Sequence, residues 1–536
     1  MNLILLGSIV LLFLLVNAFL AYLGYRGTSN ASDYLVAGRK AHPVIMAISY
    51  GATFISTAAI VGFGGAAAVY GMGVLWLTVL NIFVGIFIAF AVFGKRTRKI
   101  GHNLDAHTFP EFIGKRFDSR FLQTAAGLLI FVAMPLYAGS VIIGGTQFIA
   151  QTLGINYEVA LIFFVSVVAV YVVMGGLKGV MYADAFQGSI MFLGMIFLLV
   201  FTYINLGGVV EAHSALSALK DQAVQIFGAA GHRGWTAMPQ TGSVFWWQLV
   251  STIVLGVGIG VLAQPQLVVR FMTVKSNKEL NRAVLIGGVF IIIMTGVAFT
   301  VGALTNVYFS QTMGMVSFFA VEKMTDNIIP LFINMSMPPW FTGVFLVTLL
   351  AAAMSTLSSQ FHTMGSSFGR DFLEKGLGIK TTSSVLTTKL AMCVTIIISA
   401  ALAYALPKFF EQGSAIVAIG TAIFFGLCAA TFLPMYFGAL YTKRITKAGA
   451  IACFVSGLAV SSFWLVFVHI KESAPLGICR ALFGVDSLAS TPWLQNVDPI
   501  VVALPISAIC TIVFSIFSKP PEDKHLEMVF KGVKRG

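Results

Sequence analysis

The segment Ala351-Ala-Ala-Met-Ser-Thr-Leu-Ser-Ser359 carries four hydroxyl side chains within five residues of a long apolar run. In a helix, steps of three and four residues stack along one face, which here carries Ala352, Ser355, Thr356 and Ser359. Buried hydroxyls need partners, and a bilayer offers no water to supply them. The row therefore favours a nearby hard cation such as sodium, which takes neutral oxygen ligands. Small residues that allow close helix packing, with hydroxyls bonded to their own helix, are the alternative.

The composition indicates an integral membrane protein. The chain of 536 residues is 58% hydrophobic and 10% charged, whereas soluble domains carry about 25% charged residues. Its apolar runs are too long and continuous for the strands of an outer-membrane barrel. We predict an all-α polytopic protein with about thirteen spans, at residues 3–25, 44–70, 72–94, 121–150, 157–176, 184–206, 243–269, 283–308, 341–366, 384–406, 412–438, 448–470 and 498–518.

The charge pattern predicts the orientation of these spans. With the N-terminus outside, most of the 33 Lys and Arg residues fall in the inner loops, as the positive-inside rule requires. The first span has Arg26 after it and no basic residue before it, which is the reverse of a secretory signal. We therefore expect an uncleaved, N-out helix in the cytoplasmic membrane. Residues 1–518 would form one transmembrane domain, and residues 519–536 a short inner tail.

Two of the predicted spans look broken. The second contains Ser56-Thr-Ala-Ala-Ile-Val-Gly-Phe-Gly-Gly65, and the seventh contains Gly256-Val-Gly-Ile-Gly260 followed by Gln264-Pro-Gln266. Glycine weakens a helix, and proline removes a donor and clashes with the preceding turn. The two broken spans are five spans apart in the sequence, and they cross the membrane in opposite directions. They predict two inverted five-helix halves, at about 44–206 and 243–438, around a central transport site.

These segments resemble the sodium/solute symporter family, which includes sodium-coupled proline, pantothenate and monocarboxylate carriers. The resemblance covers nearly the whole chain, and the segments that carry it are Asp33-Tyr-Leu-Val-Ala-Gly-Arg39, Gly175-Gly-Leu-Lys-Gly-Val-Met-Tyr-Ala-Asp-Ala-Phe-Gln187, Gln264-Pro-Gln-Leu-Val-Val-Arg-Phe-Met272, Ala351 to Ser359, and Arg370-Asp371. It implies the LeuT-type inverted-repeat fold with one extra N-terminal helix. It also implies sodium-coupled symport.

The resemblance also implies ion ligands. The family's common sodium site would take carbonyl oxygens of Ala52, Ile55 and Ala352 and hydroxyls of Ser355 and Thr356. Some members hold a second sodium, and here Asp184, Ser358 and Ser359, with Ser355, match that pattern. A carboxylate at a helix start near the membrane interface is the alternative for Asp184. His362 is expected to pack or hydrogen-bond, and with almost no titratable group in the spans, sodium is favoured over protons.

The substrate is predicted only as a class. No Lys or Arg falls at mid-membrane, so an anion would be held by free amides where the outer half of the second span begins. The polar groups nearest the breaks are Ser56, Thr57 and Gln264. Sugar carriers surround their ligand with many amides and charges, which are few here. We therefore expect a small carboxylate-bearing nutrient.

Other functions are weighed against secondary transport. A solute-sensing membrane module and a proton-coupled permease of the same fold are the alternatives, and a passive channel fits two paired breaks less well. No phosphate-binding loop and no cluster of nucleophile, base and orienter is visible, so neither ATP-driven transport nor an enzyme is expected. The expected partners are a small organic solute, sodium and the lipid bilayer, without nucleic acid. The oligomeric state stays open.

Overall fold

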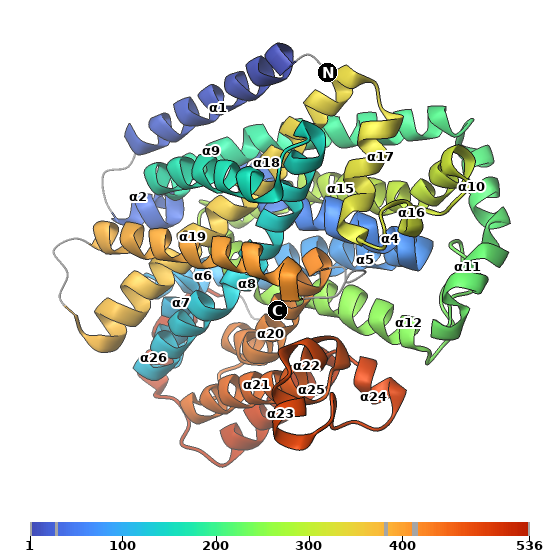
Figure 1. Cartoon of the computed structure of the whole chain (residues 1–536). Helices are drawn as coiled ribbons and strands as arrows, with labels where there is room; N and C mark the ends of the chain where they lie inside the picture. Colours follow the sequence, from blue (N-terminus) through green and yellow to red (C-terminus); the bar gives the residue numbers. More distant parts are fainter. Residues whose placement is uncertain (1–2, 27–30, 380–383, 410–415, 534–536) are drawn as a thin grey trace.

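The structure is a computed structural model, which describes residues 3–26, 31–379, 384–409 and 416–533. Over these ranges the chain is helical throughout, and the one β pairing is an isolated bridge between Ala41 and Val274. The long helices lie roughly side by side, with shorter helices at their ends (Figure 1). The predicted all-α architecture is confirmed.

The N-terminal part of the chain contains the first broken span. Its elements are α1 (Leu3–Arg26), α2 (Ala31–Val36), η1 (Ala37–Arg39), α3 (Pro43–Phe54), η2 (Ala58–Gly62), α4 (Phe63–Tyr70), η3 (Gly71–Val74), α5 (Leu75–Ile82), η4 (Phe83–Gly94), α6 (Lys95–Asn103), α7 (Phe109–Arg116), α8 (Arg120–Leu153) and α9 (Tyr157–Asn205). Helix α3 ends where Ile55 turns extended, at φ −93° and ψ 110°. The predicted break in the second span is therefore present, at Ile55 and Ser56.

Helix α9 covers both the fifth and the sixth predicted spans. Its residues 157–170 and 177–205 form separate apolar stretches. Asn17 of α1 accepts a hydrogen bond from Gln187 at 2.6 Å, and Ala18 lines one cavity together with Val167. Residues 167 and 187 would be about 30 Å apart on a straight helix. The two stretches of α9 therefore lie side by side against α1, as two spans would.

The C-terminal part contains the second broken span. Its elements are α10 (Val209–Ala218), α11 (Lys220–Phe227), η5 (Gly228–Ala230), α12 (Val244–Trp247), η6 (Gln248–Val257), α13 (Gly258–Gly260), η7 (Val261–Ala263), α14 (Pro265–Phe271), α15 (Asn277–Met313), α16 (Ser317–Ala320), η8 (Thr325–Asn327), α17 (Ile328–Ser336), α18 (Pro339–Ser366), η9 (Ser367–Leu377), α19 (Ser384–Phe409), α20 (Ile416–Tyr441), α21 (Lys447–Phe467), α22 (Ile470–Leu476), α23 (Ile478–Phe483), α24 (Pro492–Asn496), α25 (Pro499–Ile516) and α26 (Asp523–Val529). Gln264 is extended, and Pro265 starts α14, where a missing N–H costs nothing.

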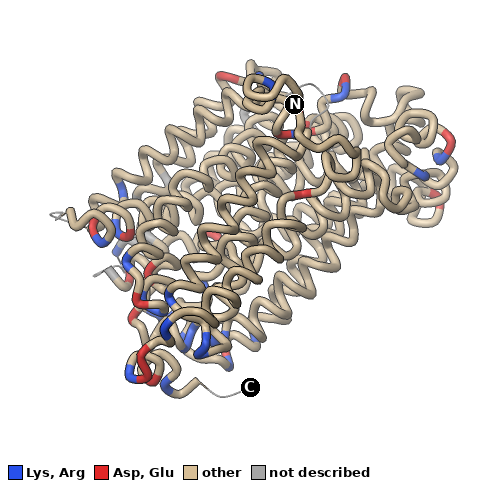
Figure 2. The backbone as a smooth tube through the Cα atoms, turned by 90° about the horizontal axis from the view of Figure 1, so that it is seen from below, with Lys and Arg blue, Asp and Glu red and all other residues tan. Residues whose placement is uncertain are grey.

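The helices are long and apolar enough to cross a membrane. Among the described residues eleven helices qualify, and two shorter apolar helices, Pro43–Phe54 and Tyr157–Val170, complete the broken second span and the fifth span. The count of thirteen remains a prediction, and the first residues of the 412–438 run lie outside the described ranges. Lys, Arg, Asp and Glu gather at the two ends of the bundle, most densely beside the C-terminus, and are sparse in its middle (Figure 2). This is the distribution expected for a multi-pass membrane protein.

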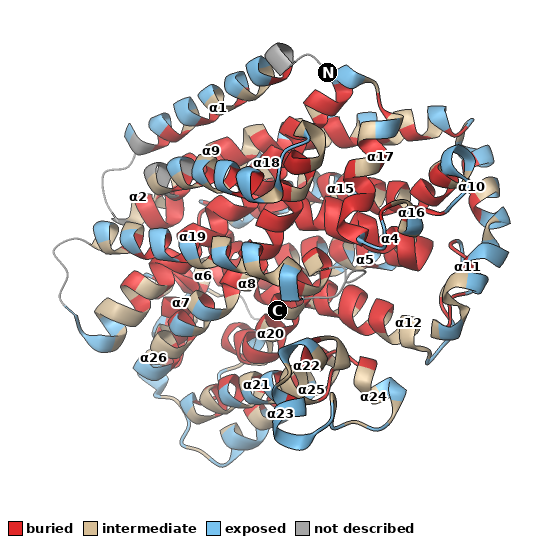
Figure 3. Cartoon of the chain, in the orientation of Figure 1, coloured by how far each residue is buried: buried red, intermediate tan, exposed pale blue. Residues whose placement is uncertain are grey.

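Burial identifies α18 as the central helix. In its most apolar window 94% of the residues are buried, against 22% for α1. Figure 3 shows α18, α15 and α4 largely buried and the outward faces of α1 and α19 exposed. The helix with the row of hydroxyls thus lies at the centre of the bundle, and α1 lies at its edge.

The segments outside the spans are partly helical. Residues 208–242, 309–340 and 471–497, which fall between the predicted spans, contain the short helices α10, α11, α16, α17, α22, α23 and α24. In the C-terminal tail, α26 docks on α6, because Asn103 donates hydrogen bonds to the carbonyls of Val529 and Lys531, both at 2.9 Å. At the same end of the bundle, Glu111 lies 3.1 Å from Arg370 and 2.9 Å from Lys115.

Candidate functional site

A cluster of neutral oxygens forms where α3 ends against α18. The last carbonyls of a helix have no partner within it. Here the Ser355 hydroxyl donates to the carbonyl of Ala52 at 2.9 Å, and the Thr356 hydroxyl donates to that of Thr53 at 3.1 Å. Ser355 also lies 3.2 Å from the carbonyl oxygen of Ala352. Ser355 and Thr356 are fully buried.

Four of the five predicted sodium ligands are therefore brought together: Ala52, Ala352, Ser355 and Thr356. The fifth, Ile55, is the extended residue at the end of α3, and it lines the neighbouring cavity. The partial negative charge at a helix C-terminus adds to the field at this point. The cluster contains no titratable side chain, so its oxygens suit a hard cation at any physiological pH.

A second cluster, one turn along α18, contains charges. Asp184 of α9 and Arg270 of α14 form an ion pair at 2.7 Å, and their side chains are 0% and 1% exposed. Ser49 donates to the same carboxylate oxygen at 2.8 Å. The Ser358 hydroxyl lies 3.5 Å from the other carboxylate oxygen of Asp184. The Ser359 hydroxyl accepts a hydrogen bond from the Arg270 guanidinium at 2.6 Å.

This second cluster corrects two expectations. The alternative for Asp184, a carboxylate at a helix start near the interface, is wrong, because Asp184 is fully buried inside α9. The prediction that no Lys or Arg is buried within the spans is also wrong. Arg270, which follows the predicted seventh span and was therefore placed in an inner loop, is enclosed by protein. Its signal in the sequence was Pro265, which starts a new helix of seven buried residues that carries Arg270 inward. The packing role predicted for His362 is confirmed, since its ring meets the carbonyl of Tyr34 at 3.1 Å.

A small cavity lies beside the neutral cluster, between both broken spans. Its volume is about 20 Å³, which leaves room for about one water. Most of its wall is aromatic or aliphatic. Its lining residues are Phe54, Ile55, Ser56, Ala59, Phe63, Leu77, Asn81, Tyr137, Val257, Thr295, Phe299, Thr421 and Phe425. The rings interlock, with Phe54 stacked on Phe425 and Tyr137 edge-on to Phe425.

The three predicted substrate residues separate in the structure. Ser56 lines the cavity. Thr57 turns away and donates to the carbonyl of Val141 in α8 at 2.6 Å. Gln264 is fully buried and does not line the cavity. Its amide donates to the carbonyl of Gly260 at 3.4 Å, next to the second break, and accepts from the Gln266 side chain at 3.2 Å.

The remaining polar groups of the cavity were missed from the sequence. They are Asn81, Tyr137, Thr295 and Thr421. The Asn81 side chain is 2% exposed, and no described residue bonds to its carbonyl oxygen. These residues sit singly in four different helices, so no local motif announces them. Only the packing of α5, α8, α15 and α20 brings them to one point.

The amino-acid sequence is similar to those of known sodium-coupled transporters. Residues 34–457 match the sodium:solute symporter family. The sodium/proline symporter of Staphylococcus aureus (strain bovine RF122 / ET3-1) is 29% identical over 524 residues, which cover 96% of this chain and 92% of that protein. Another S. aureus sodium/proline symporter is 29% identical over 523 residues, with the same coverage of both chains.

One solved structure has the same fold. The substrate-bound outward-open state of a Na⁺-coupled sialic acid symporter superimposes with a TM-score of 0.72 at 18% sequence identity, over 97% of this chain and 99% of that one. The likeness confirms the predicted LeuT-type fold. With a family match over most of its length, clustered neutral oxygens and two broken spans, the chain belongs to the sodium:solute symporter family and is a sodium-coupled membrane transporter, not an enzyme.

Proposed function

We propose that this protein takes up a small carboxylate-bearing nutrient together with sodium, by alternating access. The observation that carries the proposal is the position of the cavity: it lies against the break at Ile55 and Ser56, and the same break ends the helix that supplies the sodium carbonyls. Substrate and ion would therefore be held by the two sides of one interruption. Binding of either would stabilise the same local geometry, which is the basis of coupling.

The chemistry of the cavity supports the substrate class. The first N–H groups of a helix have no carbonyl partner in the preceding turn and attract anions. The outer half of the broken span begins here with Ser56 and Thr57, and the Ser56 hydroxyl accepts from the Ala58 N–H at 3.1 Å, a bond that a substrate carboxylate would have to share or replace. A sodium ion at the neutral cluster would add positive charge beside a carboxylate. The aromatic wall and the scattered hydroxyls suit a compact body with few polar groups. Proline, monocarboxylates and pantothenate all belong to this class.

We assign the coupling sodium to the neutral cluster of Ala52, Ile55, Ala352, Ser355 and Thr356. At the second cluster of Asp184, Ser358 and Ser359, the structure has Arg270 as the cation. We propose that this guanidinium supplies the positive charge that a second sodium would supply in the sequence-based prediction. The number of sodium ions moved per substrate decides between the two.

The proposal is tested by sodium-driven uptake in proteoliposomes. An inward sodium gradient should drive accumulation of a labelled carboxylate, and replacement of sodium by choline should abolish it. Proline and prolinamide form a matched pair, because they share the ring and differ in the carboxylate. The proposal requires that the acid of such a pair competes for uptake and the amide does not. Equal competition by acid and amide, or stronger competition by sugars, would contradict it.

A further inference from the structure

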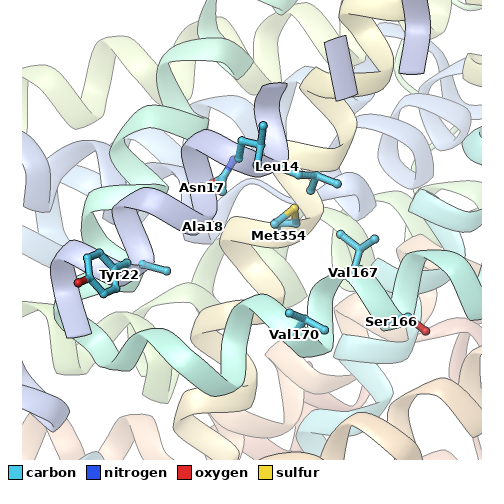
Figure 4. A pocket seen from close by; sticks show the side chains of 10 residues that line it. Leu14, Asn17, Ala18, Tyr22, Ser166, Val167, Val170 and Met354 are labelled. Carbon is cyan, nitrogen blue, oxygen red and sulfur yellow. The ribbon is translucent and has the colours of Figure 1, made fainter. Parts of the chain in front are cut away.

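A large cavity lies at the edge of the bundle, and its lining residues do not include those of the two helix breaks. It has a volume of about 480 Å³ and separates α1 from the first stretch of α9, with α18 behind. Its lining residues are Leu14, Leu15, Asn17, Ala18, Ala21, Tyr22, Ser166, Val167, Val170 and Met354. Figure 4 shows Met354 between the α1 residues and the valines of α9.

The cavity follows from how α1 packs. On one side, α1 meets the second stretch of α9 closely: a Cβ on Gly24 would lie 2.2 Å from the Cα of Gly179. Phe13 also stacks on Phe186 with centroids 6.1 Å apart. On the other side, α1 leaves a gap to residues 166–170. Helix α1 is therefore fixed along one edge and open along the other.

The walls of the cavity offer almost nothing to water. Its polar side chains are Asn17, Ser166 and Tyr22. Both ends of the Asn17 amide are occupied: it donates to the carbonyl of Phe13 at 2.7 Å and accepts from Gln187 at 2.6 Å. Figure 4 shows the Ser166 hydroxyl directed away from the other labelled side chains. Predominantly apolar cavities stay dry. The space therefore calls for an apolar occupant.

The position of the cavity relative to the membrane indicates which apolar molecule can fill it. Both α1 and α9 cross the membrane, and Ala18 and Val170 of the cavity wall are exposed, so the cavity opens sideways into the hydrocarbon. From Leu14 to Tyr22, α1 rises about 12 Å, close to the roughly 15 Å thickness of one leaflet. At the mouth, the Arg26 guanidinium lies 5.7 Å from the centre of the Tyr22 ring. This pairing suits the phosphate level of a membrane.

We propose that this crevice, defined by its ten lining residues, binds one acyl chain of an anionic glycerophospholipid. The tail enters from the membrane face where Arg26 meets the headgroup phosphate, and its end reaches Met354. Met354 is fully buried at the inner end of the crevice and directly precedes Ser355, so the lipid tail packs close to the helix turn that carries the neutral oxygen cluster. The binding itself does not depend on which solute is carried.

The test uses the full-length protein in vesicles that contain phosphatidylglycerol with a photoreactive group in the acyl chain. After illumination, peptide mass spectrometry should place the label on residues 14–22 and 166–170. Ala18→Phe fills the crevice and should reduce this label severalfold. Leu12→Phe is the matched control, since Leu12 is 64% exposed on the same helix and does not line the crevice; it should leave the label unchanged.

A second variant protects the test against misfolding. Val167→Phe blocks the opposite wall from a different helix, and it should give the same loss. Equal labelling of the wild type and both variants, or labelling spread evenly over all lipid-facing helices, would overturn the proposal. So would disulfide-linked dimers of an Ala18→Cys variant without lipid label, because a second copy of the chain would then cover the crevice.

Discussion

The two oxygen clusters on α18 are one helical turn apart and differ in how their charge is balanced. At Ser355 and Thr356 the oxygens are neutral and come from hydroxyls and from carbonyls at the end of α3. The Arg270 guanidinium bonds instead to the neighbouring hydroxyls of Thr53 and Ser359. At Ser358 and Ser359 the oxygens surround an ion pair that the protein supplies itself. We propose that the first cluster receives a cation, whereas the second already contains one.

The difference shows why a buried carboxylate is a poor indicator of a metal site. A carboxylate removed from water needs a counter-charge, and the chain can provide it as a guanidinium. A cluster of neutral oxygens is the stronger sign, because its hydroxyl and carbonyl dipoles need no counter-charge and can turn toward a hard cation.

The largest expected effect is at the charged cluster. Arg270→Gln leaves Asp184 buried without its cation, and breaking a buried pair costs about 3–5 kcal/mol. We expect a clear loss of thermal stability in detergent, and partial recovery when Asp184→Asn is added. Arg480→Gln is the control, because Arg480 pairs with Asp486 at 2.6 Å but is 67% exposed, and water screens an exposed pair so that its loss has little effect on stability.

This first comparison has a simple contrary outcome. If Arg270→Gln and Arg480→Gln melt at the same temperature, the buried ion pair contributes no more to the stability of the fold than the exposed one. The contrast between the two clusters would then lose its energetic basis.

The next effect is at the neutral cluster. Thr356→Ala and Ser355→Ala each remove one oxygen with little change in volume, so the fold should survive. An unmet polar partner costs about 1–3 kcal/mol, and we expect sodium to bind more weakly by that amount. The sodium concentration for half-maximal uptake measures it.

The control lies on the same helix. Thr348 also carries a buried hydroxyl, but it bonds to the carbonyl of Val344 in its own helix at 3.1 Å. Thr348→Ala should leave the sodium dependence unchanged. Equal shifts in Thr348→Ala and Thr356→Ala would mean that the hydroxyls only pack α18.

The sequence was informative where one local pattern decides the structure. Apolar length indicated the spans, glycine and proline indicated the breaks, and the row of hydroxyls on one helix face indicated the neutral cluster. These signals depend on residues within a turn or two of each other.

The parts that were missed depend on contacts between distant segments. Arg270 lies in α14, a short buried helix that begins at Pro265 after the predicted break. In the sequence it directly follows the predicted end of a span, where a basic residue normally lies in an inner loop. Asn81 and Tyr137 line the cavity singly, from helices far apart in the chain. Thr57 and Gln264 stand at the breaks, yet the rotation of their backbone directs both away from the cavity, and no periodicity fixes that rotation.

A third carboxylate sharpens the comparison, because it is buried without a cation. Asp326 lies in η8, outside the membrane spans, and is 6% exposed. It accepts from the N–H of Val417 at 3.3 Å, and no ion pair involves it among the described residues. Burial raises its pKa to about 7, and the N–H groups of Val417 and Ile416 oppose that rise.

The sign of the pH effect follows from this raised pKa. An unfolded Asp titrates near pH 4. The folded state therefore holds its proton between about pH 4 and 7, and stability is highest below that window and falls as the pH rises through it. In Asp326→Asn this part of the pH dependence should vanish. Melting curves of both proteins from pH 4 to 8 measure the difference, and parallel curves would refute the prediction.

The smallest expected effect is on the coupling ratio in Asp184→Asn. If Arg270 is the cation of the second cluster, one sodium moves with each substrate in the wild type and in the variant, although the variant is less stable. If Asp184 instead ligates a second sodium, the ratio falls from two to one. Removing a carboxylate that faces a cation deletes a strong attraction where water is scarce, so a bound ion could not persist unnoticed. The reversal potential of transport in proteoliposomes measures the ratio and is independent of how many molecules survive purification. A lower ratio in the variant would assign the second cluster to sodium and remove the distinction between the two clusters.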